Sequence, residues 1–377
     1  MEKSQEKYPN LISAEILADS LNQFGERITT MKLVFPRIIL AEFNTHRMFN
    51  RNSASSRAIP FKKMVKIVEE QPFIPIAWQK DHKGMQGTEY AQYPDTEDFK
   101  VIWLEARDNA IKSAQLAQTG SVKLTKQLCN RLLEPFMWTT VLLTSSKEGL
   151  DNFFNLRAGN YGFTIDGNYH QFKSKKELLG SRFGYLYKDN TDLQWLQMNK
   201  GQAEIHIMDL AEKIYDAVNE SIPRQLEVGQ WHIPFGDDFD INKLKEIYIS
   251  SGYNPENPTP DNYYFKELDN LKLKIAVARC ARISYETLGD NPVVDYKKDI
   301  ELHDTLFAIK HMSPFEHCAV VMEEEEYIKH IKTSSALFED SATEREGIIY
   351  NDLVINDRDL GWSRNLKGFK QYREIIE

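Results

Sequence analysis

The feature that most constrains this chain is a polar stretch, residues 44–57, directly after an apolar segment. It holds three arginines, one histidine, three asparagines and three serines, with almost no aliphatic bulk. Between Arg37 and Lys66 there are seven Arg or Lys residues and one acid, Glu42, although the chain has a net charge of -9. Arginine binds phosphate oxygens bidentately, and hydroxyls and backbone N–H groups complete such sites. The stretch predicts a site for phosphate or another polyanion; the alternative is a solvated turn whose arginines pair with surface acids.

The preceding residues predict how this stretch is held. Ile28–Val34 begins with β-branched residues and predicts a strand, which Pro36 ends. Residues 38–47 have apolar side chains at helical spacing. We therefore expect the polar stretch at the end of a buried helix and in the turn beyond it. A lone histidine such as His46 is more often an ordinary surface or core residue, and that alternative stays open here.

Length and composition limit the class of protein. The 377 residues, 41% hydrophobic and 27% charged, predict two domains or one large domain with insertions. No run approaches the roughly 18 apolar residues of a membrane helix, and the polar amino terminus differs from a signal peptide, so we expect a cytoplasmic protein with no membrane partner. The pI of about 5.6 argues against a nucleic-acid partner. The three cysteines, Cys129, Cys280 and Cys318, lie far apart and have no C-x-x-C spacing. We therefore expect neither a disulfide framework nor a metal site.

Further helices are predicted beyond the polar stretch. Asp98–Leu116 and Val122–Leu133 are amphipathic, and the second places Arg131 in its last turn. A third apolar face runs from Leu150 to Arg157. Proline-rich patterns predict a long irregular loop and a linker, at Ala58–Tyr93 and Ser251–Asn262 respectively.

Four segments resemble the flavin-dependent thymidylate synthases. The motif of that family is Arg-His-Arg, seven further residues and Ser-x-Arg, and residues 45–57 match every position but the first. The helix that ends Asn-Leu-Arg at Arg157 resembles a second family segment, and Gln-Ala-Glu-Ile at 202–205 a third. His-Met-Ser-Pro-Phe-Glu-His at 311–317 is similar to the family's His-x-Thr-Pro-Phe-Glu-His, which lies there in the amino-terminal half. The resemblance covers roughly residues 28–57, 131–157, 202–219 and 275–327, in permuted order.

The resemblance implies an α/β (α+β) fold, a mixed sheet with helices, with permuted segments and an inserted lobe at residues 158–200. We expect residues 1–250 to form the motif-bearing nucleotide and flavin domain. Residues 251–270 would be a linker, and residues 271–377 the permuted segment that completes the flavin and folate site.

The resemblance also implies an enzyme, a methyltransferase of nucleotide biosynthesis. It would transfer a one-carbon unit from methylenetetrahydrofolate to C5 of dUMP, giving dTMP, with bound FAD and with NADPH as reductant. The family builds its sites between subunits, so a homotetramer is implied. The alternatives are hydroxymethylation, modification of another pyrimidine deoxynucleotide on the same fold, and a non-catalytic nucleotide-binding homologue. No cysteine has the Pro-Cys-His context of the unrelated cysteine-dependent enzymes, so none is expected to be a nucleophile.

The matched positions imply roles for single residues. Arg157 would lie against the pyrimidine, where a permanently charged guanidinium stabilises developing negative charge. His311 would lie over the flavin and folate. The phosphate of dUMP would be bound by Ser55, Ser56, Arg57 and Arg131. Contacts to FAD would come from His46, Arg47, Ser146, Asn152, Ser313 and Glu316.

Five positions depart from the family pattern, including Ser53 and Ala58, which stand where the family has Glu and Tyr. Thr45 replaces the first arginine of the motif, and Glu148 replaces an arginine that contacts the flavin. Glu42 replaces a glutamine that contacts the phosphate, where a carboxylate would repel a dianion. Gln371, in the segment Phe369–Arg373 that we expect to be helical, is a candidate for the missing amide. The alternative is a surface helix with no role at the site.

Overall fold

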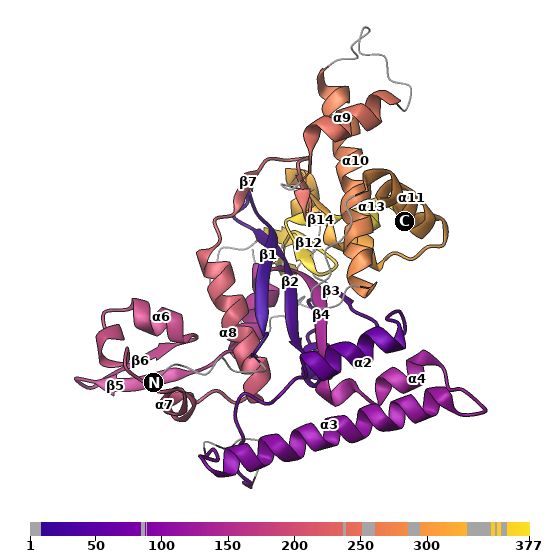
Figure 1. Ribbon diagram of the computed structural model, residues 1–377. Helices are drawn as coiled ribbons and strands as arrows, with labels where there is room; N and C mark the ends of the chain where they lie inside the picture. The colour runs from indigo at the N-terminus through magenta and orange to yellow at the C-terminus, as the bar shows by residue number, and fades with distance from the viewer. Residues whose placement is uncertain are drawn as a thin grey trace.

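A five-stranded sheet lies at the centre of the protein (Figure 1). The computed structural model describes residues 9–83, 87, 89–236, 239–250, 261–285, 295–329, 348–350, 353–355 and 360–377. The strand order is β3-β4-β2-β1-β7, and every neighbouring pair is antiparallel except β1 with β7. The strands are β1 (Ser13–Asn22), β2 (Arg27–Pro36), β3 (Asn50–Ser53), β4 (Trp138–Ser146) and β7 (Arg224–Leu226).

A tight turn joins β1 to β2. The Asn22 side-chain oxygen accepts hydrogen bonds from the backbone N–H groups of Phe24 and Glu26, both at 3.0 Å. Gly25 has a φ of 78°, which a residue without Cβ adopts at little cost. β2 then pairs with β1 on one side and β4 on the other, so it is an interior strand. The predicted strand at Ile28–Val34 is confirmed.

One face of the sheet is apolar and packs against two helices. Met31 lies opposite Leu143, and Leu33 opposite Val141, so alternate residues of β2 and β4 present their side chains to this face. All four belong to a core cluster that also contains Phe153. The covering helices are α5 (Lys147–Arg157) and α8 (Ile205–Glu220). The predicted helix ending at Arg157 is confirmed.

The other face carries a buried chain of hydrogen bonds. Thr30 and Thr144, on β2 and β4, have hydroxyl oxygens 2.6 Å apart. His232 bonds Ser20 through Nδ1 and Thr30 through Nε2, both at 2.8 Å, and His317 Nδ1 lies 2.9 Å from Thr144 Oγ1. Burial lowers the pKa of His232 to about 4 and that of His317 to about 3, so both are neutral at pH 7. These bonds fix two carboxyl-terminal segments on the sheet, β8 (Trp231–His232) and η6 (Ser313–His317).

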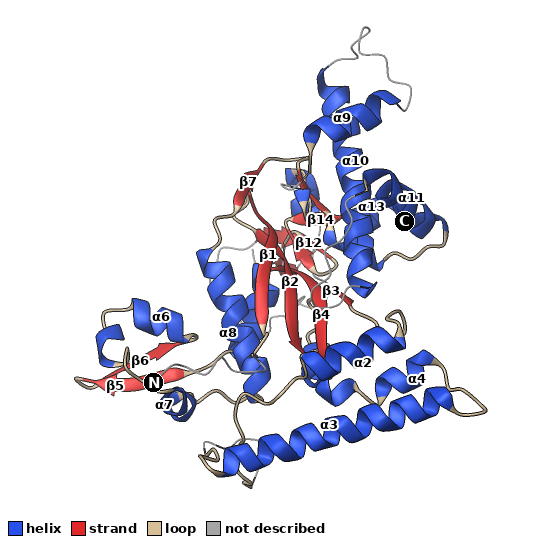
Figure 2. Cartoon of the chain, in the orientation of Figure 1, coloured by secondary structure: helices blue, strands red, loops and turns tan. Residues whose placement is uncertain are grey.

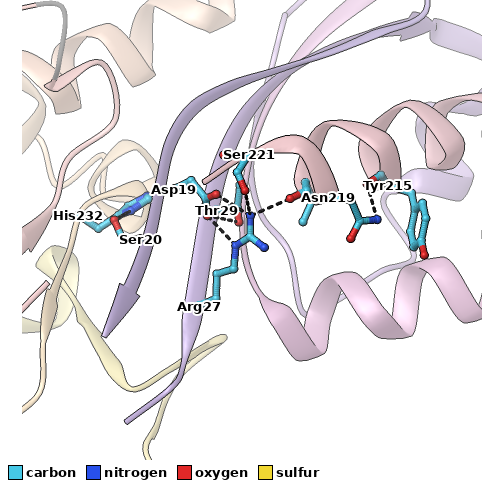
Figure 3. A network of polar contacts seen from close by, with 9 residues as sticks. Asp19, Ser20, Arg27, Thr29, Tyr215, Asn219, Ser221 and His232 are labelled. Atoms are coloured by element: carbon cyan, nitrogen blue, oxygen red, sulfur yellow. Dashed lines mark hydrogen bonds and ion pairs between the residues drawn. The ribbon is translucent and has the colours of Figure 1, made fainter. Parts of the chain in front are cut away.

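A bidentate ion pair ties the hairpin to the end of α8 (Figure 3). Arg27 donates from Nε and Nη2 to the two carboxylate oxygens of Asp19, at 2.9 and 2.6 Å. The same guanidinium donates to the carbonyl oxygens of Val218 and Ser221, at 2.8 and 3.3 Å. Carbonyl groups at a helix carboxyl terminus lack intrahelical partners, and Arg27 supplies one. The pair fixes where α8 ends against β1.

Three helices gather at one end of the sheet (Figure 1). They share a core that includes Val68, Ile111 and Leu133. The helix predicted at Asp98–Leu116 is confirmed, and the one predicted at Val122–Leu133 is present but shorter, with Arg131 in its last turn. The prediction of an irregular Ala58–Tyr93 was wrong in part, because residues 61–70 are helical. The helices are α2 (Phe61–Glu70), α3 (Asp95–Thr119) and α4 (Lys126–Arg131).

Residues 161–198 form a small lobe beside α8 (Figure 2). Tyr161, Leu178 and Trp195 make its core. Glu212 of α8 anchors the lobe, because it accepts hydrogen bonds from the Tyr161 hydroxyl and the Lys175 backbone N–H, both at 2.8 Å. Burial raises the pKa of Glu212. The elements are β5 (Tyr161–Ile165), β6 (Asn168–Phe172), α6 (Lys175–Gly180), η3 (Gly184–Leu186) and α7 (Asp192–Met198).

The carboxyl-terminal part adds helices and a three-stranded sheet of order β14-β9-β8. Residues 251–260 of the predicted linker lie outside the described residues, and from Asp261 onward the chain is helical. Phe369–Arg373 was expected to be a helix, but Phe369–Gln371 is a strand and the helix begins at Tyr372. The helices are α9 (Ile241–Ser250), α10 (Asp261–Arg282), η5 (Ile283–Tyr285), α11 (Tyr296–Ala308), α12 (Glu324–Lys329) and α13 (Tyr372–Ile376). The strands are β9 (Ala319–Val321), β10 (Ile348–Tyr350), β11 (Leu353–Ile355), β12 (Trp362–Ser363), β13 (Leu366–Lys367) and β14 (Phe369–Gln371).

Candidate functional site

The basic stretch leaves the sheet through two short helical turns and returns as the edge strand β3. The turns are η1 (Arg37–Ile39) and α1 (Leu40–Phe43), shorter than the helix expected over residues 38–47. His46 follows them and is buried, with its ring 4.8 Å from that of Phe153 and 5.7 Å from that of Phe49. Its Nε2 has no hydrogen-bond partner among the described residues. Burial, then the charges of Arg157 and Arg51, lower the pKa of His46 to about 4, so the imidazole is neutral at pH 7.

Arg157 lies beside this histidine, at the last residue of α5. Its Nε is 3.0 Å from a carboxylate oxygen of Glu42, an ion pair without hydrogen-bond geometry. The side chains are 25% and 32% exposed, so the pair lies at the edge of the protein core. Glu42 therefore faces a guanidinium, and its charge is balanced within the protein. From the sequence, Glu42 was predicted only to repel a phosphate, and its contact with Arg157 was not predicted.

Arg51 shapes the turn that carries His46, and sequence analysis gave it no role. Its Nη1 donates to the carbonyl oxygens of His46 and Phe43, at 2.9 and 3.3 Å. Burial lowers the pKa of Arg51, and the charge of Glu316 opposes that shift. Asn50 donates to the Glu316 carbonyl at 3.3 Å, which joins η6 to β3. Arg51 was identifiable only as one of the three arginines in the basic stretch.

The next residues, Ser55 to Arg57, are tied to α4. Asn130 donates from its buried side-chain nitrogen to the carbonyl oxygens of Ser56 and Ile59, at 2.8 and 3.1 Å. The backbone N–H of Ser55 donates to the Ser284 carbonyl at 2.9 Å. Ser56 is buried, whereas Arg57 is exposed. The sequence did not predict a role for Asn130, because a side-chain amide that donates to two backbone carbonyls has no characteristic sequence motif.

Arg131 is the residue after Asn130 in α4, and its side chain is exposed. Its Nη1 is 3.5 Å from Glu134, which also pairs with Arg37 at 3.1 Å. More than half of the Arg131 side chain is accessible, at 53%, so this ion pair leaves most of the guanidinium open. Ser55, Ser56 and Arg57 thus lie in the loop that Asn130 of α4 holds, whereas Arg131 has Glu134 as its ion-pair partner.

The residues expected to contact FAD differ in accessibility. Ser146 is buried at the N-cap of α5, and its hydroxyl neither caps the helix nor has another described partner. Arg47 and Asn152 are exposed, as is His311, and Ser313 is half-buried. Glu316 pairs with Arg373 of α13 at 2.5 Å, so the carboxyl-terminal helix already holds that carboxylate.

Glu148, which reverses the charge of a family arginine, also meets a cation from the end of the chain. Lys367 of β13 lies 3.4 Å from Glu148 and 2.9 Å from Glu26. The lysine side chain is 8% exposed. A buried ammonium with two carboxylates balances the local charge better than an isolated Glu148 would. The hairpin of β12 and β13, which carries Lys367, is therefore in contact with the first turn of α5.

Gln371 lies in β14, opposite Ala319 of β9, and is 1% exposed. Its side-chain oxygen has no described hydrogen-bond partner. No described hydrogen bond joins it to Ser55, Ser56, Arg57 or Arg131, so its role at a phosphate stays a prediction. The expected surface helix is replaced by a buried strand position.

The chain is a mixed α/β protein whose basic loop contacts α4 through Asn130 and α5 through His46 and Phe153. Among the described residues, no helix is long and apolar enough to cross a membrane. No protein-family model and no curated protein matches the chain.

Solved structures with partial similarity include a UMP/dUMP methylase and a flavin-dependent thymidylate synthase. One is a UMP/dUMP methylase, PolB, from Streptomyces cacaoi: bound with 5-Br UMP it is 13% identical, with a TM-score of 0.33 over 40% of this chain and 79% of that chain. Bound with 5-Br dUMP, it is 12% identical, with a TM-score of 0.33 over 51% of this chain and 95% of that chain. Another is the flavin-dependent thymidylate synthase ThyX from Helicobacter pylori, complexed with FAD and dUMP: 13% identical, TM-score 0.26, 51% of this chain and 67% of that chain. TM-scores this low do not define a shared fold, so function is argued below from the residues.

Proposed function

We propose that this protein binds dUMP and transfers a one-carbon unit from methylenetetrahydrofolate to its C5, giving dTMP, with FAD as cofactor and NADPH as reductant. The observation that carries the proposal is the contact of Arg157 with Glu42 beside the buried, neutral His46. These residues come from two of the segments that resemble the flavin-dependent thymidylate synthases. The same resemblance leads us to propose a homotetramer.

Arg157 is suited to stabilise charge on a pyrimidine. Glu42 restrains its guanidinium, so little reorganisation is needed when negative charge develops on a ring next to it. His46 is uncharged at pH 7 and neither competes for the anion nor repels Arg157. A quarter of the Arg157 side chain is exposed, which leaves an open face for a substrate.

The phosphate of dUMP is assigned to the joint between the basic loop and α4. Arg57 and Arg131 are exposed there, and the backbone of Ser55 and Ser56 is held by hydrogen bonds from outside the loop. A loop fixed in advance binds an anion with less loss of conformational entropy. Arginine also supplies a geometry that matches phosphate oxygens.

The residues on the flavin side fit a bound dinucleotide. His46 Nε2 and Ser146 Oγ are buried polar atoms that no described residue satisfies, and a ligand atom would satisfy them. Arg47 offers an exposed cation for a phosphate group. Asn152, Ser313 and Glu316 complete the proposed set. FAD would supply the redox chemistry, whereas these side chains would bind and orient it. His311, also exposed, is assigned to the folate side.

The test is Arg157→Ala. We expect turnover of dUMP to be abolished while the flavin content of the purified protein stays nearly unchanged, because the proposed partner of Arg157 is the pyrimidine. Lys147→Ala is the matched control, since Lys147 begins the same helix and is 64% exposed. Normal turnover by the Arg157 variant would remove this residue from the mechanism.

Two measurements on the wild-type protein separate the alternatives. A flavin absorbance spectrum supports an enzyme, and its absence under reconstitution with FAD supports a nucleotide-binding homologue. The mass of the product from dUMP then distinguishes methyl from hydroxymethyl transfer.

A further inference from the structure

Residues of helices α2, α3 and α4 line a cleft of about 670 Å³. Figure 1 shows these three helices at the end of the central sheet. Its apolar wall comes from Pro60, Phe61 and Val65. Its volume lies within the range of roughly 300–1,000 Å³ that is typical of small-molecule sites. The polar lining residues are Lys62, Gln115, Gln118, Thr119, Lys123 and Lys126.

The charge of the cleft is positive in an acidic protein. Three lysines line it and no carboxylate does, among the residues that the structure describes, although the whole chain has a net charge of -9. Lys62 and Lys123 make no hydrogen bond or ion pair with described residues. Lys126 donates one hydrogen bond, to the Ala58 carbonyl at 3.2 Å, and an ammonium group has three N–H donors. Most of the donor capacity of the cleft is therefore open to an anionic ligand.

The remaining lining favours a ring-bearing ligand. Phe61 is half-buried and Val65 is buried, so together they form a fixed apolar wall. Gln118 donates to the Leu124 carbonyl at 2.7 Å and so holds the loop that carries Lys123. Gln115 is exposed, and a primary amide both donates to and accepts from the polar edge of a heterocycle.

We propose that this cleft binds a nucleoside triphosphate. The three ammonium groups match the charge of a polyphosphate, while the apolar wall and Gln115 face a base. The cleft shares no residue with those assigned to dUMP or FAD, but it adjoins the proposed phosphate site, because Lys126 donates to the carbonyl of Ala58, next to Arg57. Competition with dUMP therefore distinguishes this inference from the proposed function.

Isothermal titration calorimetry with ATP and with dTTP tests the proposal. We expect saturable binding by the wild-type protein, and a loss of about a hundredfold in the double variant Lys62→Ala, Lys123→Ala, since hydrogen bonds to charged groups contribute about tenfold each. Lys66→Ala is the matched control. It removes a lysine of α2 that does not line the cleft and lies 3.9 Å from Glu70. Thermal unfolding of each variant verifies that the fold is kept.

Two further measurements define the ligand. Inorganic tripolyphosphate is expected to bind at least tenfold more weakly than the nucleotides, because it lacks the base, and dUMP is expected not to displace them. Absence of saturable nucleotide binding, or equal affinity in the double variant and in Lys66→Ala, would overturn the site. Equal affinity for tripolyphosphate and nucleotides would overturn the assignment to a nucleotide.

Discussion

Lys367→Met is expected to lower the free energy of unfolding by about 3 kcal/mol. The Lys367 side chain is 8% exposed and lies between Glu26, which is 12% exposed, and Glu148, which is 33% exposed. Methionine keeps the apolar stem but removes the ammonium, so the two carboxylates would keep only the more distant charge of Lys147. Removing one partner of a buried ion pair costs about 3–5 kcal/mol. We take the lower end, because water screens the partly exposed Glu148.

The assay is equilibrium unfolding in urea, followed by both tryptophan fluorescence and circular dichroism. Coincident transitions would justify a single free energy of unfolding. Glu26→Gln in the Lys367→Met background is expected to recover about 1 kcal/mol or more, because it removes one of the unpaired charges. Glutamine keeps an acceptor for the hydroxyl of Tyr327, which donates to Glu26 at 2.9 Å.

Lys370→Met is the matched control. Lys370 lies three residues away and pairs with Glu326 at 3.0 Å, but these side chains are 25% and 39% exposed. Its loss is expected to stay within about 1 kcal/mol, the usual range for an exposed pair. If both substitutions cost the same small amount, Lys367 is not the buried counter-ion that balances Glu148, and the reasoning fails.

Three further predictions concern binding, pH and thiols. Arg57→Ala and Arg131→Ala are each expected to weaken dUMP binding by roughly 1.5–3 kcal/mol, with little loss for deoxyuridine; an equal loss for the nucleoside would assign them to the fold. Stability should fall as the pH drops from 6.5 to about 4, because the unfolded chain binds protons there that the buried imidazoles do not. Each of these histidines should contribute up to about 3 kcal/mol to the loss of unfolding free energy. A urea midpoint that does not change with pH over this range would contradict the burial of His46, His232 and His317. A folded variant that lacks all three thiols should keep activity, since burial raises the thiol pKa of two of them; a covalent nucleotide adduct would refute this for Cys129, Cys280 or Cys318.

Local sequence patterns were sufficient to predict several of the elements that carry the proposed site. The β-branched start of Ile28–Val34 predicted a strand, and apolar spacing predicted the helices that end near Arg131 and Arg157. Prediction failed for residues 61–70, because Pro60 and Pro72 on either side were read as signs of a continuous loop. A proline before the first helical residue is compatible with a helix, since its missing N–H has no intrahelical acceptor.

The pairing of charged residues, by contrast, follows from tertiary contacts that no local pattern predicts. The pairs Glu42–Arg157 and Glu148–Lys367 join residues that lie more than a hundred positions apart, and the hydrogen-bond chain from Ser20 to His317 crosses most of the protein. Local periodicity reports which face of an element is apolar, but not which distant side chain will meet it. The pKa of a titratable side chain, and the free energy of a charged one, depend on burial and on neighbouring groups that only the folded chain brings together.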